Sequence, residues 1–188
     1  MISTSDFKTG LTIELDGKVY QIVSSEFHKP GKGQAVVRTR LKDLETGNTF
    51  AKTFRSGEKV EPARVERKEM QFLYATGDAY VFMDLDSYDQ VELSQEQVAD
   101  QAKWLKDGES VWFISHNGRI LGIDVANTVD RRVVRTDPGV RGDTAQGGTK
   151  PATIEGGAVV TVPLFINQDE IIRVDTRSGE YVTRVTNQ

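Results

Sequence analysis

Apolar and polar residues alternate over short stretches of this chain, and turn residues separate the stretches. Residues 11–15 alternate, Asp16-Gly17 is a strong two-residue turn signal, and residues 19–23 continue the alternation. An alternation with period two is typical of strands that have one buried face. The sequence therefore predicts a β-hairpin here, and residues 35–40 and 49–54 predict further strands of one compact β module.

The same pattern begins again near Lys68. Strand-like runs lie at residues 69–74, 79–84, 88–93, 109–115 and 119–125. Between the third and the fourth run, Ser94 and Gln97 match a capping box, and the apolar residues after them predict a short amphipathic helix that ends near Asp107-Gly108. This order of strands and helix is typical of a five-stranded barrel of the oligonucleotide-binding (OB) type.

A third series of strand patterns starts near Thr128 and contains no clear helix. Its strands are expected at residues 129–136, 157–164, 171–175 and 181–185. Residues 137–151 form a long loop rich in Gly, Asp and Thr, and loops of this length are often functional. We therefore predict an all-β chain of three small domains, at residues 1–63, 64–127 and 128–188.

The composition agrees with several small cores, because only 37% of the 188 residues are hydrophobic. No apolar run approaches the roughly 20 residues of a membrane span. No basic segment followed by an apolar stretch opens the chain, so the sequence predicts no signal peptide. We accordingly expect a cytoplasmic monomer that does not associate with membranes.

The residue inventory offers little for enzymatic chemistry. The chain has no cysteine, which removes disulfides, thiolate metal sites and cysteine nucleophiles. His28 and His116 are its only histidines, neither lies in a metal-binding pattern, and no Gly-x-Ser-x-Gly elbow is present. We therefore expect no catalytic residue, no bound metal and no cofactor.

The charges are distributed unevenly between the three predicted domains. Residues 1–63 carry 10 basic and 8 acidic side chains, residues 64–127 carry 6 and 12, and residues 128–188 carry 8 and 8. An acidic middle between more basic ends suggests a protein that touches a polyanion at its ends. Ordinary scatter of surface charge is the alternative at this point.

A glycine-rich loop between two predicted strands is the most distinctive local feature. Residues 29–34 read Lys-Pro-Gly-Lys-Gly-Gln, but the distant glycine and the hydroxyl residue of a Walker loop are missing. The residues after the loop alternate like a strand and do not open a helix, which argues against dinucleotide binding. Pro30 stiffens the loop, and Gly31 and Gly33 leave Lys32 without steric neighbours. Lys32 is therefore either a plain solvated turn lysine or a cation presented to another molecule.

Nine short motifs resemble the elongation factor P family of bacteria, in the order and spacing of that family. They lie at residues 7–10, 29–34, 52–55, 70–74, 136–139, 142–145, 148–153, 162–165 and 175–182. Any one of them is a weak sign, but together they run from one end of the chain to the other. The resemblance implies an SH3-like, KOW-type N-terminal domain followed by two OB-type barrels, in an L-shaped arrangement like that of a tRNA.

The resemblance also implies a function in translation. A factor of this family binds both ribosomal subunits, between the sites for the peptidyl and the exiting tRNA. It stimulates peptide-bond formation at consecutive prolines by stabilising peptidyl-tRNA. It is a non-enzymatic effector, because the ribosome itself performs peptidyl transfer.

Residue roles follow from the same resemblance. Lys32 matches the tip residue that lies near the tRNA 3′ end and that a lysine-modifying enzyme extends in many members. The other residues of the tip loop are Lys29, Pro30, Gly31, Gly33 and Gln34. The residues that match contacts to messenger RNA in the exit site and to the small subunit are Gly142, Asp143, Thr144, Ala145, Tyr181 and Arg184.

A different class of function stays open from the sequence alone. The chain could be a general single-stranded RNA-binding module that uses its barrel faces instead of the loop. Its net charge of −4 speaks against that reading. A hydrolase has no supporting group of residues.

Overall fold

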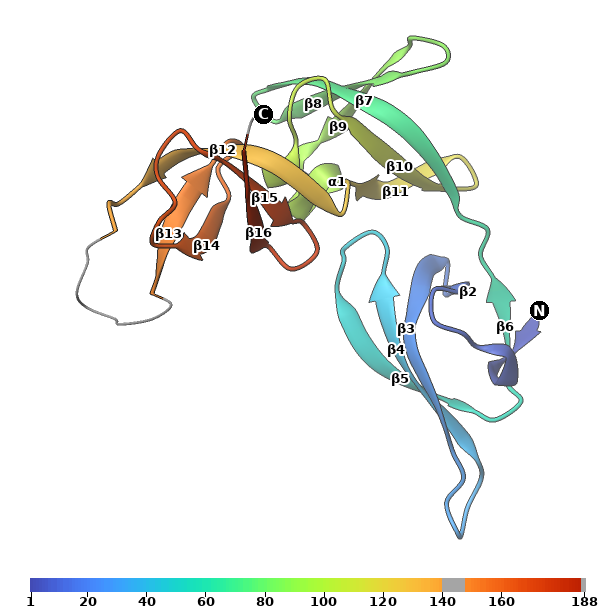
Figure 1. Cartoon of the computed structure of the whole chain (residues 1–188). Helices are drawn as coiled ribbons and strands as arrows, with labels where there is room; N and C mark the ends of the chain where they lie inside the picture. The colour runs from blue at the N-terminus through green and yellow to red at the C-terminus, as the bar shows by residue number, and fades with distance from the viewer. Residues whose placement is uncertain (140–147, 187–188) are drawn as a thin grey trace. The chain divides into compact units, whose positions relative to one another are not determined.

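Antiparallel strands make up most of the molecule, which a computed structural model describes at residues 1–139 and 148–186 (Figure 1). The strands of this part form three curled sheets of six, five and five strands. The chain divides into two compact units, residues 1–68 with 113–122 and residues 69–112 with 123–188. The all-β prediction is therefore confirmed.

The first sheet lies in the first unit. Its strands are β1 (Ile2–Ser3), β2 (Thr12–Leu15), β3 (Lys18–His28), β4 (Val36–Asp43), β5 (Thr49–Arg55) and β6 (Lys59–Pro62), with a short 3-10 helix, η1 (Thr4–Asp6), after β1. The strand order is β1-β6-β2-β3-β4-β5. The alternation pattern does not predict β1, η1 or β6, because elements of two to four residues are too short to show a period.

Alternation along β4 shows why this sheet has one buried face. Val37 and Leu41 are buried, and Arg38 and Arg40 between them are exposed. The apolar residues close on a core in which the rings of Phe7 and Phe54 meet edge to face, with centroids 5.3 Å apart.

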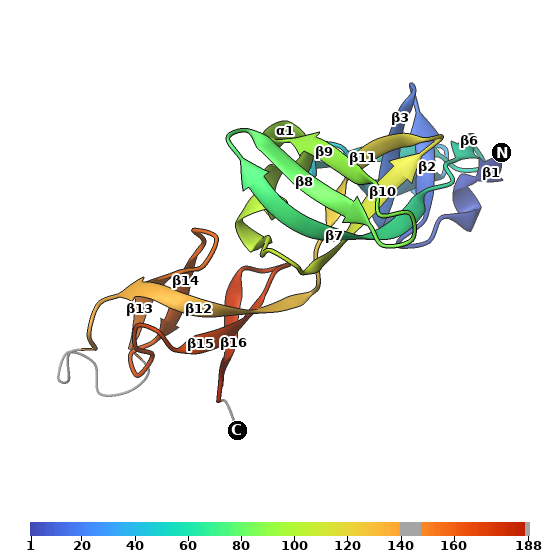
Figure 2. The same cartoon turned by 90° about the horizontal axis from the view of Figure 1, so that it is seen from above.

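The second sheet has the order β11-β10-β7-β8-β9. Its strands are β7 (Glu66–Thr76), β8 (Ala79–Asp84), β9 (Gln90–Ser94), β10 (Ser110–His116) and β11 (Arg119–Asp124). Seen from above, β7 and β8 run side by side as a strongly curved pair (Figure 2).

The predicted helix after β9 is present but much shorter than expected. The capping box forms: Gln97 donates its backbone N–H to Ser94 Oγ at 3.3 Å, and Ser94 donates its own to Gln97 Oε1 at 2.9 Å. The α-helix α1 (Gln95–Val98) ends after one turn, where Ala99 has a φ of 47°. A 3-10 helix, η2 (Ala99–Trp104), replaces the remainder. The helix to residue 107 was therefore a wrong prediction.

The third sheet has the order β14-β13-β12-β15-β16. Its strands are β12 (Thr128–Thr136), β13 (Thr149–Ile154), β14 (Val159–Pro163), β15 (Ile171–Asp175) and β16 (Glu180–Val185). The buried aromatic residue of this core is Trp104, which η2 contributes and which packs among Val133, Ile154 and Ile172.

A buried arginine ties η2 to the third sheet within the second unit. The Arg131 side chain has no solvent exposure, and both terminal nitrogens donate to the carboxylate of Glu109, at 2.8 and 2.7 Å. The same guanidinium donates to the backbone carbonyls of Trp104 and Asp130, at 2.7 and 2.8 Å. The second and third sheets are therefore joined by a hydrogen-bonded ion pair as well as by Trp104.

The strand ends fall close to the predicted domain boundaries. β6 ends at Pro62 and β7 begins at Glu66; β11 ends at Asp124 and β12 begins at Thr128. The limits at residues 63 and 127 stay a prediction. In the described residues, no helix has the length and apolar character needed to cross a membrane.

Candidate functional site

The loop of residues 29–35 closes a long hairpin of the first unit. β3 and β4 pair from Tyr20 and Asp43 up to His28 and Val36 at the base of the loop. β5 continues the ladder on the other side of β4 up to the same level, where Arg55 lies opposite Val36. Figure 1 shows the closed end of this hairpin projecting beyond the rest of its sheet. Three hydrogen-bonded strands therefore hold the base of the loop in place.

Within the loop, two residues restrict the backbone on either side of Lys32. Pro30 is half-buried, and Gly33 has a φ of 116°, which favours glycine. A Cβ on Gly33 would lie 3.6 Å from Cγ of Pro30, so the proline ring sits against this glycine. Gly31 has open space around it. The predicted loop residues thus form one continuous turn.

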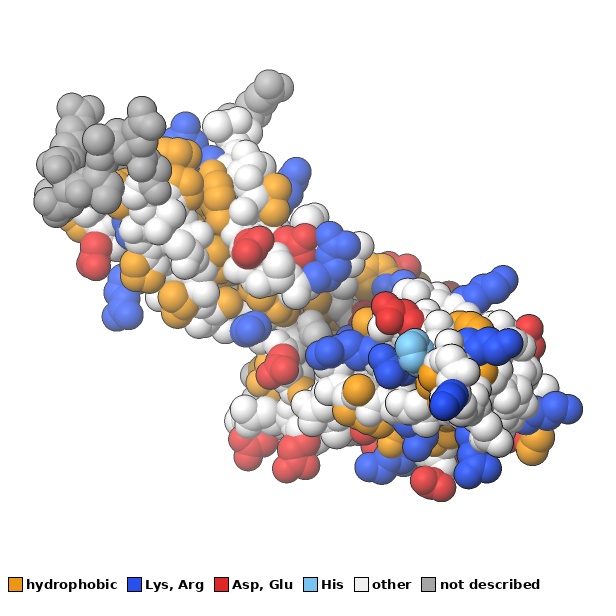
Figure 3. All heavy atoms as spheres, turned by 90° about the horizontal axis from the view of Figure 1, so that it is seen from below, with side chains coloured by type: hydrophobic (Ala, Val, Ile, Leu, Met, Phe, Trp, Pro, Cys, Tyr) orange, Lys and Arg blue, Asp and Glu red, His pale blue; other side chains and the backbone are white. Residues whose placement is uncertain are grey.

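The Lys32 side chain is exposed, and so is that of Lys29. Neither ammonium forms an ion pair with a described residue. Phe27, on the β3 side of the loop, is 64% exposed, and Arg38 is exposed on β4. Figure 3 views the first unit from the side toward which its hairpin points in Figure 1, and several Lys and Arg side chains lie there among acidic and apolar ones. The loop can therefore offer a cation and an aromatic ring to an anionic partner.

Tyr181 and Arg184 lie on β16, in the second unit. A bulge opposite Arg173 and Val174 interrupts the pairing of β15 with β16, so that Tyr181 pairs with Val174 and Arg184 with Ile172. Val174 and Ile172 both face the core, so the bulge brings Tyr181 and Arg184 to the same face although they are three residues apart. In a regular strand they would point to opposite faces.

The surroundings of these two residues differ. Tyr181 is half-buried and packs against the core of the third sheet. The guanidinium of Arg184 lies over the ring of Phe165, 5.3 Å from its centroid, and 3.6 Å from Glu170, with 43% of its side chain exposed. Phe165, 56% exposed, was not predicted as a site residue. The predicted contacts Gly142, Asp143, Thr144 and Ala145 lie outside the described residues.

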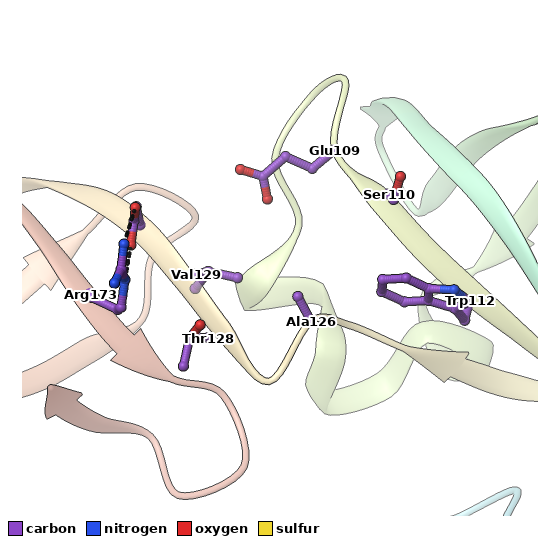
Figure 4. Close-up of a pocket in the computed structure, with 8 residues that line it drawn as sticks. Glu109, Ser110, Trp112, Ala126, Thr128, Val129 and Arg173 are labelled. Carbon is purple, nitrogen blue, oxygen red and sulfur yellow. Dashed lines mark hydrogen bonds and ion pairs between the residues drawn. The ribbon is translucent and has the colours of Figure 1, made fainter.

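A cavity of about 360 Å³ in the second unit lies between the start of β10 and strands β12 and β15 (Figure 4). Asp130 and Arg173 line it and form a two-point ion pair, at 2.8 and 3.2 Å. The hydrogen bond from Arg173 lowers the pKa of the Asp130 carboxyl, and the same bond raises the pKa of Arg173. Glu109, also in the lining, is bound to Arg131. Each charged group in this lining is therefore engaged in an ion pair, Asp130 with Arg173 and Glu109 with Arg131.

The two histidines have different surroundings. His28 is exposed at the end of β3. His116 Nδ1 lies 2.8 Å from the backbone carbonyl of Arg64, and its Nε2 lies 3.9 Å from Glu14. In the part of the chain that the structure describes, no group of three or more His, Asp or Glu side chains is placed to hold a metal ion.

Family models match the chain in three consecutive segments. Residues 3–60 match the elongation factor P KOW-like domain, residues 65–123 the elongation factor P OB domain, and residues 129–184 the elongation factor P C-terminal domain. The expectation of a KOW-type domain followed by OB-type barrels is confirmed by these matches and by the curled sheets.

Full-length relatives and a solved structure agree with the family models. Elongation factor P of Moorella thermoacetica is 53% identical over 98% of this chain and all of that protein. Elongation factor P of Coprothermobacter proteolyticus is 54% identical, again over 98% of this chain and all of that protein. A solved structure of eukaryotic translation initiation factor 5A from Methanococcus jannaschii matches with a TM-score of 0.52 and 26% identity, over 65% of this chain and 92% of that one.

Three consecutive domain models match the chain, and full-length relatives are identical to it at about half of all positions. The chain therefore belongs to the elongation factor P family.

Proposed function

We propose that this translation elongation factor binds the ribosome between the peptidyl and exit tRNA sites and stimulates peptide-bond formation at consecutive prolines. Its family membership supports a role in translation elongation. The observation that carries the finer proposal is the exposed Lys32, which forms no ion pair with a described residue, on a loop supported at its base by three paired strands. We infer that it acts in the cytoplasm, where ribosomes translate messenger RNA.

The chemistry of proline explains why such a factor is useful. The pyrrolidine ring fixes φ and makes the nitrogen a constrained nucleophile, so consecutive prolines react slowly in peptidyl transfer. Holding two reactants in a reactive geometry can lower the barrier by several kcal/mol without any new catalytic group. A factor that orients the 3′ end of peptidyl-tRNA can therefore accelerate the reaction while the ribosome performs it. The protein needs no catalytic residue of its own for this role.

Lys32 is the residue proposed to make that contact. An ammonium with no ion-pair partner among the described residues is free to approach the phosphates and hydroxyls of the tRNA 3′ end. Gly31 has open space around it and Gly33 has a positive φ, so the backbone beside Lys32 can come close to RNA. The same exposure makes Lys32 accessible to a lysine-modifying enzyme, which would lengthen its reach. Lys29 is proposed as an additional phosphate contact.

Tyr181 and Arg184 are proposed as contacts of the second unit with the small subunit. Their common face and the partly exposed guanidinium over Phe165 support this role. Residues 142–145 are proposed to contact messenger RNA in the exit site, on the family resemblance alone.

Reconstituted translation of a messenger with three consecutive prolines tests the proposal. We expect the protein to raise the yield of full-length product strongly, and to leave a matched messenger without prolines unchanged. Lys32→Ala should reduce the stimulation at least about tenfold, because a misplaced reactant loses rate steeply. Lys29→Ala, in the same loop, should have a smaller effect.

Two results would contradict the proposal. If Lys32→Ala stimulates as well as the wild-type protein, the lysine does not act in the proposed way. If the wild-type protein, purified from its own host, does not raise the yield from the proline messenger, the proposed role at proline runs is wrong. Protein from a host that lacks the modifying enzyme separates the contribution of the modification from that of the bare lysine.

A further inference from the structure

Three turns of this protein, one in each sheet, have the same structure. They connect β4 to β5, β8 to β9 and β15 to β16, at residues 43–48, 84–89 and 175–180. In each turn the first residue is aspartate, and its Oδ1 accepts the N–H of the third residue at 2.8 Å. The N–H of the fifth residue donates to the carbonyl of that aspartate, at 2.8, 2.9 and 2.7 Å in the three turns. A hydroxyl at the fourth residue accepts the N–H of the sixth at 3.3 Å in all three.

The fifth residue of this turn must adopt a left-handed backbone, and the residue type at this position differs between the three turns. Gly47 and Gly179 have φ values of 77° and 75°, and glycine adopts them without steric cost. The β8–β9 turn has Tyr88 instead, with a φ of 63°. A bulky residue is unfavourable in this region. Its ring gains no compensating burial, because Tyr88 is 72% exposed. Neither the backbone conformation of the turn nor packing in the core of its barrel explains why residue 88 is a tyrosine.

The turns also differ in what covers them. In the β4–β5 turn, Leu44 is half-buried against Val19, Ala63 and Leu121, and Glu45 is bound by Arg119. In the β15–β16 turn, Thr176 donates its hydroxyl to the carbonyl of Ala126 at 2.6 Å, and Arg177 is bound to Asp175. Each of these turns is therefore occupied by contacts within its own unit.

The second and third residues of the β8–β9 turn lack such cover. Leu85, at the position of Leu44 and Thr176, is 38% exposed. Asp86, at the position of Glu45 and Arg177, forms no ion pair with a described residue. The turn thus presents Leu85 and Tyr88 together with Asp86 and Asp89, all on the surface. Strained backbone that carries an exposed aromatic side chain suggests selection for an external contact.

We propose that this turn, residues 84–89, is a docking surface for a basic protein with an apolar depression that receives the Tyr88 ring. Asp86 and Asp89 are exposed, no basic residue lies in these six positions, and residues 64–127 carry 12 acidic and 6 basic side chains. This charge complements a cationic protein surface and repels the phosphates of RNA. The inference rests on the proposed function, because RNA-binding proteins of the ribosome are the source of such surfaces.

The test compares the ribosome affinity of variants by fluorescence anisotropy of the labelled protein. Tyr88→Gly restores the residue of the other two turns, so its melting temperature should not fall. We expect it to bind ribosomes about tenfold more weakly, as for an aromatic interface anchor. Tyr88→Phe should retain the affinity. Tyr74→Ser, which changes another exposed tyrosine of the same barrel, should stay within about twofold of the wild type. Equal affinity of Tyr88→Gly and the wild type would overturn the proposal.

Photocrosslinking identifies the class of partner. With p-benzoyl-phenylalanine in place of Tyr88, the expected product is a crosslink to a basic ribosomal protein. Crosslinks to ribosomal RNA or to a second copy of this chain, or none at all, would overturn the proposal. The two proposals fail separately: at saturating concentration Tyr88→Gly should still stimulate translation of proline runs, whereas an inactive wild-type protein would refute the proposed function instead.

Discussion

Charged side chains of this protein differ mainly in whether their own chain supplies a partner. Lys32 and Lys29 have no ion pair among the described residues, whereas Asp175 is held from several sides. The Arg177 guanidinium donates to both oxygens of the Asp175 carboxylate, and the N–H groups of Arg177 and Ser178 donate to one of them. Because all of these bonds favour the charged form, they lower the pKa of Asp175 to about 2.

This lowered pKa predicts a stability change in acid. A carboxyl whose pKa is lower in the folded than in the unfolded chain stabilises the fold above its ordinary pKa. For Asp175 the contribution should be complete above about pH 4 and disappear as the pH falls toward 2. NMR titration of the Asp175 carboxyl, with thermal melts over the same pH range, measures both effects.

The Arg177→Gln variant tests whether the arginine causes the lowered pKa of Asp175. Without the guanidinium, the pKa of Asp175 should move back toward its ordinary value of 3.8, and the acid-dependent part of the stability should shrink. An Asp175 titration that is the same in both proteins would show that the arginine is not responsible.

At the scale of elements, η2 packs closely against the turn between β13 and β14. A Cβ on Gly156 would lie 2.5 Å from the backbone carbonyl oxygen of Lys103, and Gly156 has a φ of 90°. The neighbouring Gly157 has a similar φ of 94° but open space around its Cα. The two glycines therefore separate the effect of a left-handed backbone from that of a close approach.

Alanine substitutions at these glycines should destabilise the second unit unequally. Both variants have the backbone strain, about 1–2 kcal/mol, but only Gly156→Ala also forces η2 away. We expect Gly156→Ala to cost about 1–3 kcal/mol more than Gly157→Ala, as overpacking does. Urea unfolding followed by tryptophan fluorescence reports on this unit, because Trp104 and Trp112 both lie in it. Equal losses of unfolding free energy in the two variants would mean that η2 moves away from residue 156 without an energetic cost.

The buried Arg131 joins elements through hydrogen bonds that no other residue type can reproduce. Arg131→Ala removes its bonds to Glu109 and to the carbonyl of Trp104, and it leaves space in the core. We expect a loss of about 3 kcal/mol in the free energy of unfolding, from the same urea experiment. Arg131→Lys should recover only part of the loss, because an ammonium cannot make the two-point contact.

Arg135 on the same strand is the matched control. It is exposed, so Arg135→Ala should change the free energy of unfolding by no more than about 0.5 kcal/mol. A small effect of Arg131→Ala as well would mean that the ion pair contributes little to the joint between the second and third sheets.

For the whole molecule, the overall charge separates the proposed function from general RNA binding. A net charge of −4 gives no long-range attraction for a polyanion, and the acidic excess lies in residues 64–127. We expect the isolated protein to bind a single-stranded RNA oligonucleotide only weakly, with a Kd above about 100 µM at physiological salt. Fluorescence anisotropy at several salt concentrations measures this. A micromolar Kd with a steep salt dependence would favour the single-stranded RNA-binding alternative.

The local features of this protein follow from its sequence alone. The turn at Asp16-Gly17, the capping box at Ser94 and the alternation along β4 all appear where they were predicted. The tip loop around Lys32 was also located correctly between two strands. These features depend on hydrogen bonds and side-chain periods within a few residues, which a linear sequence contains in full.

Which distant residues meet depends on the packing of the whole fold. The fold places Trp104 in the core of the third sheet, buries Arg131 against Glu109, and brings Tyr181 and Arg184 to one face through a bulge. It also covers Leu44 and leaves the equivalent Leu85 exposed. The two leucines stand in turns with the same local hydrogen bonds, so neither turn chemistry nor hydrophobicity distinguishes them. Their burial depends on what the rest of the chain brings beside them, and that is set by long-range packing.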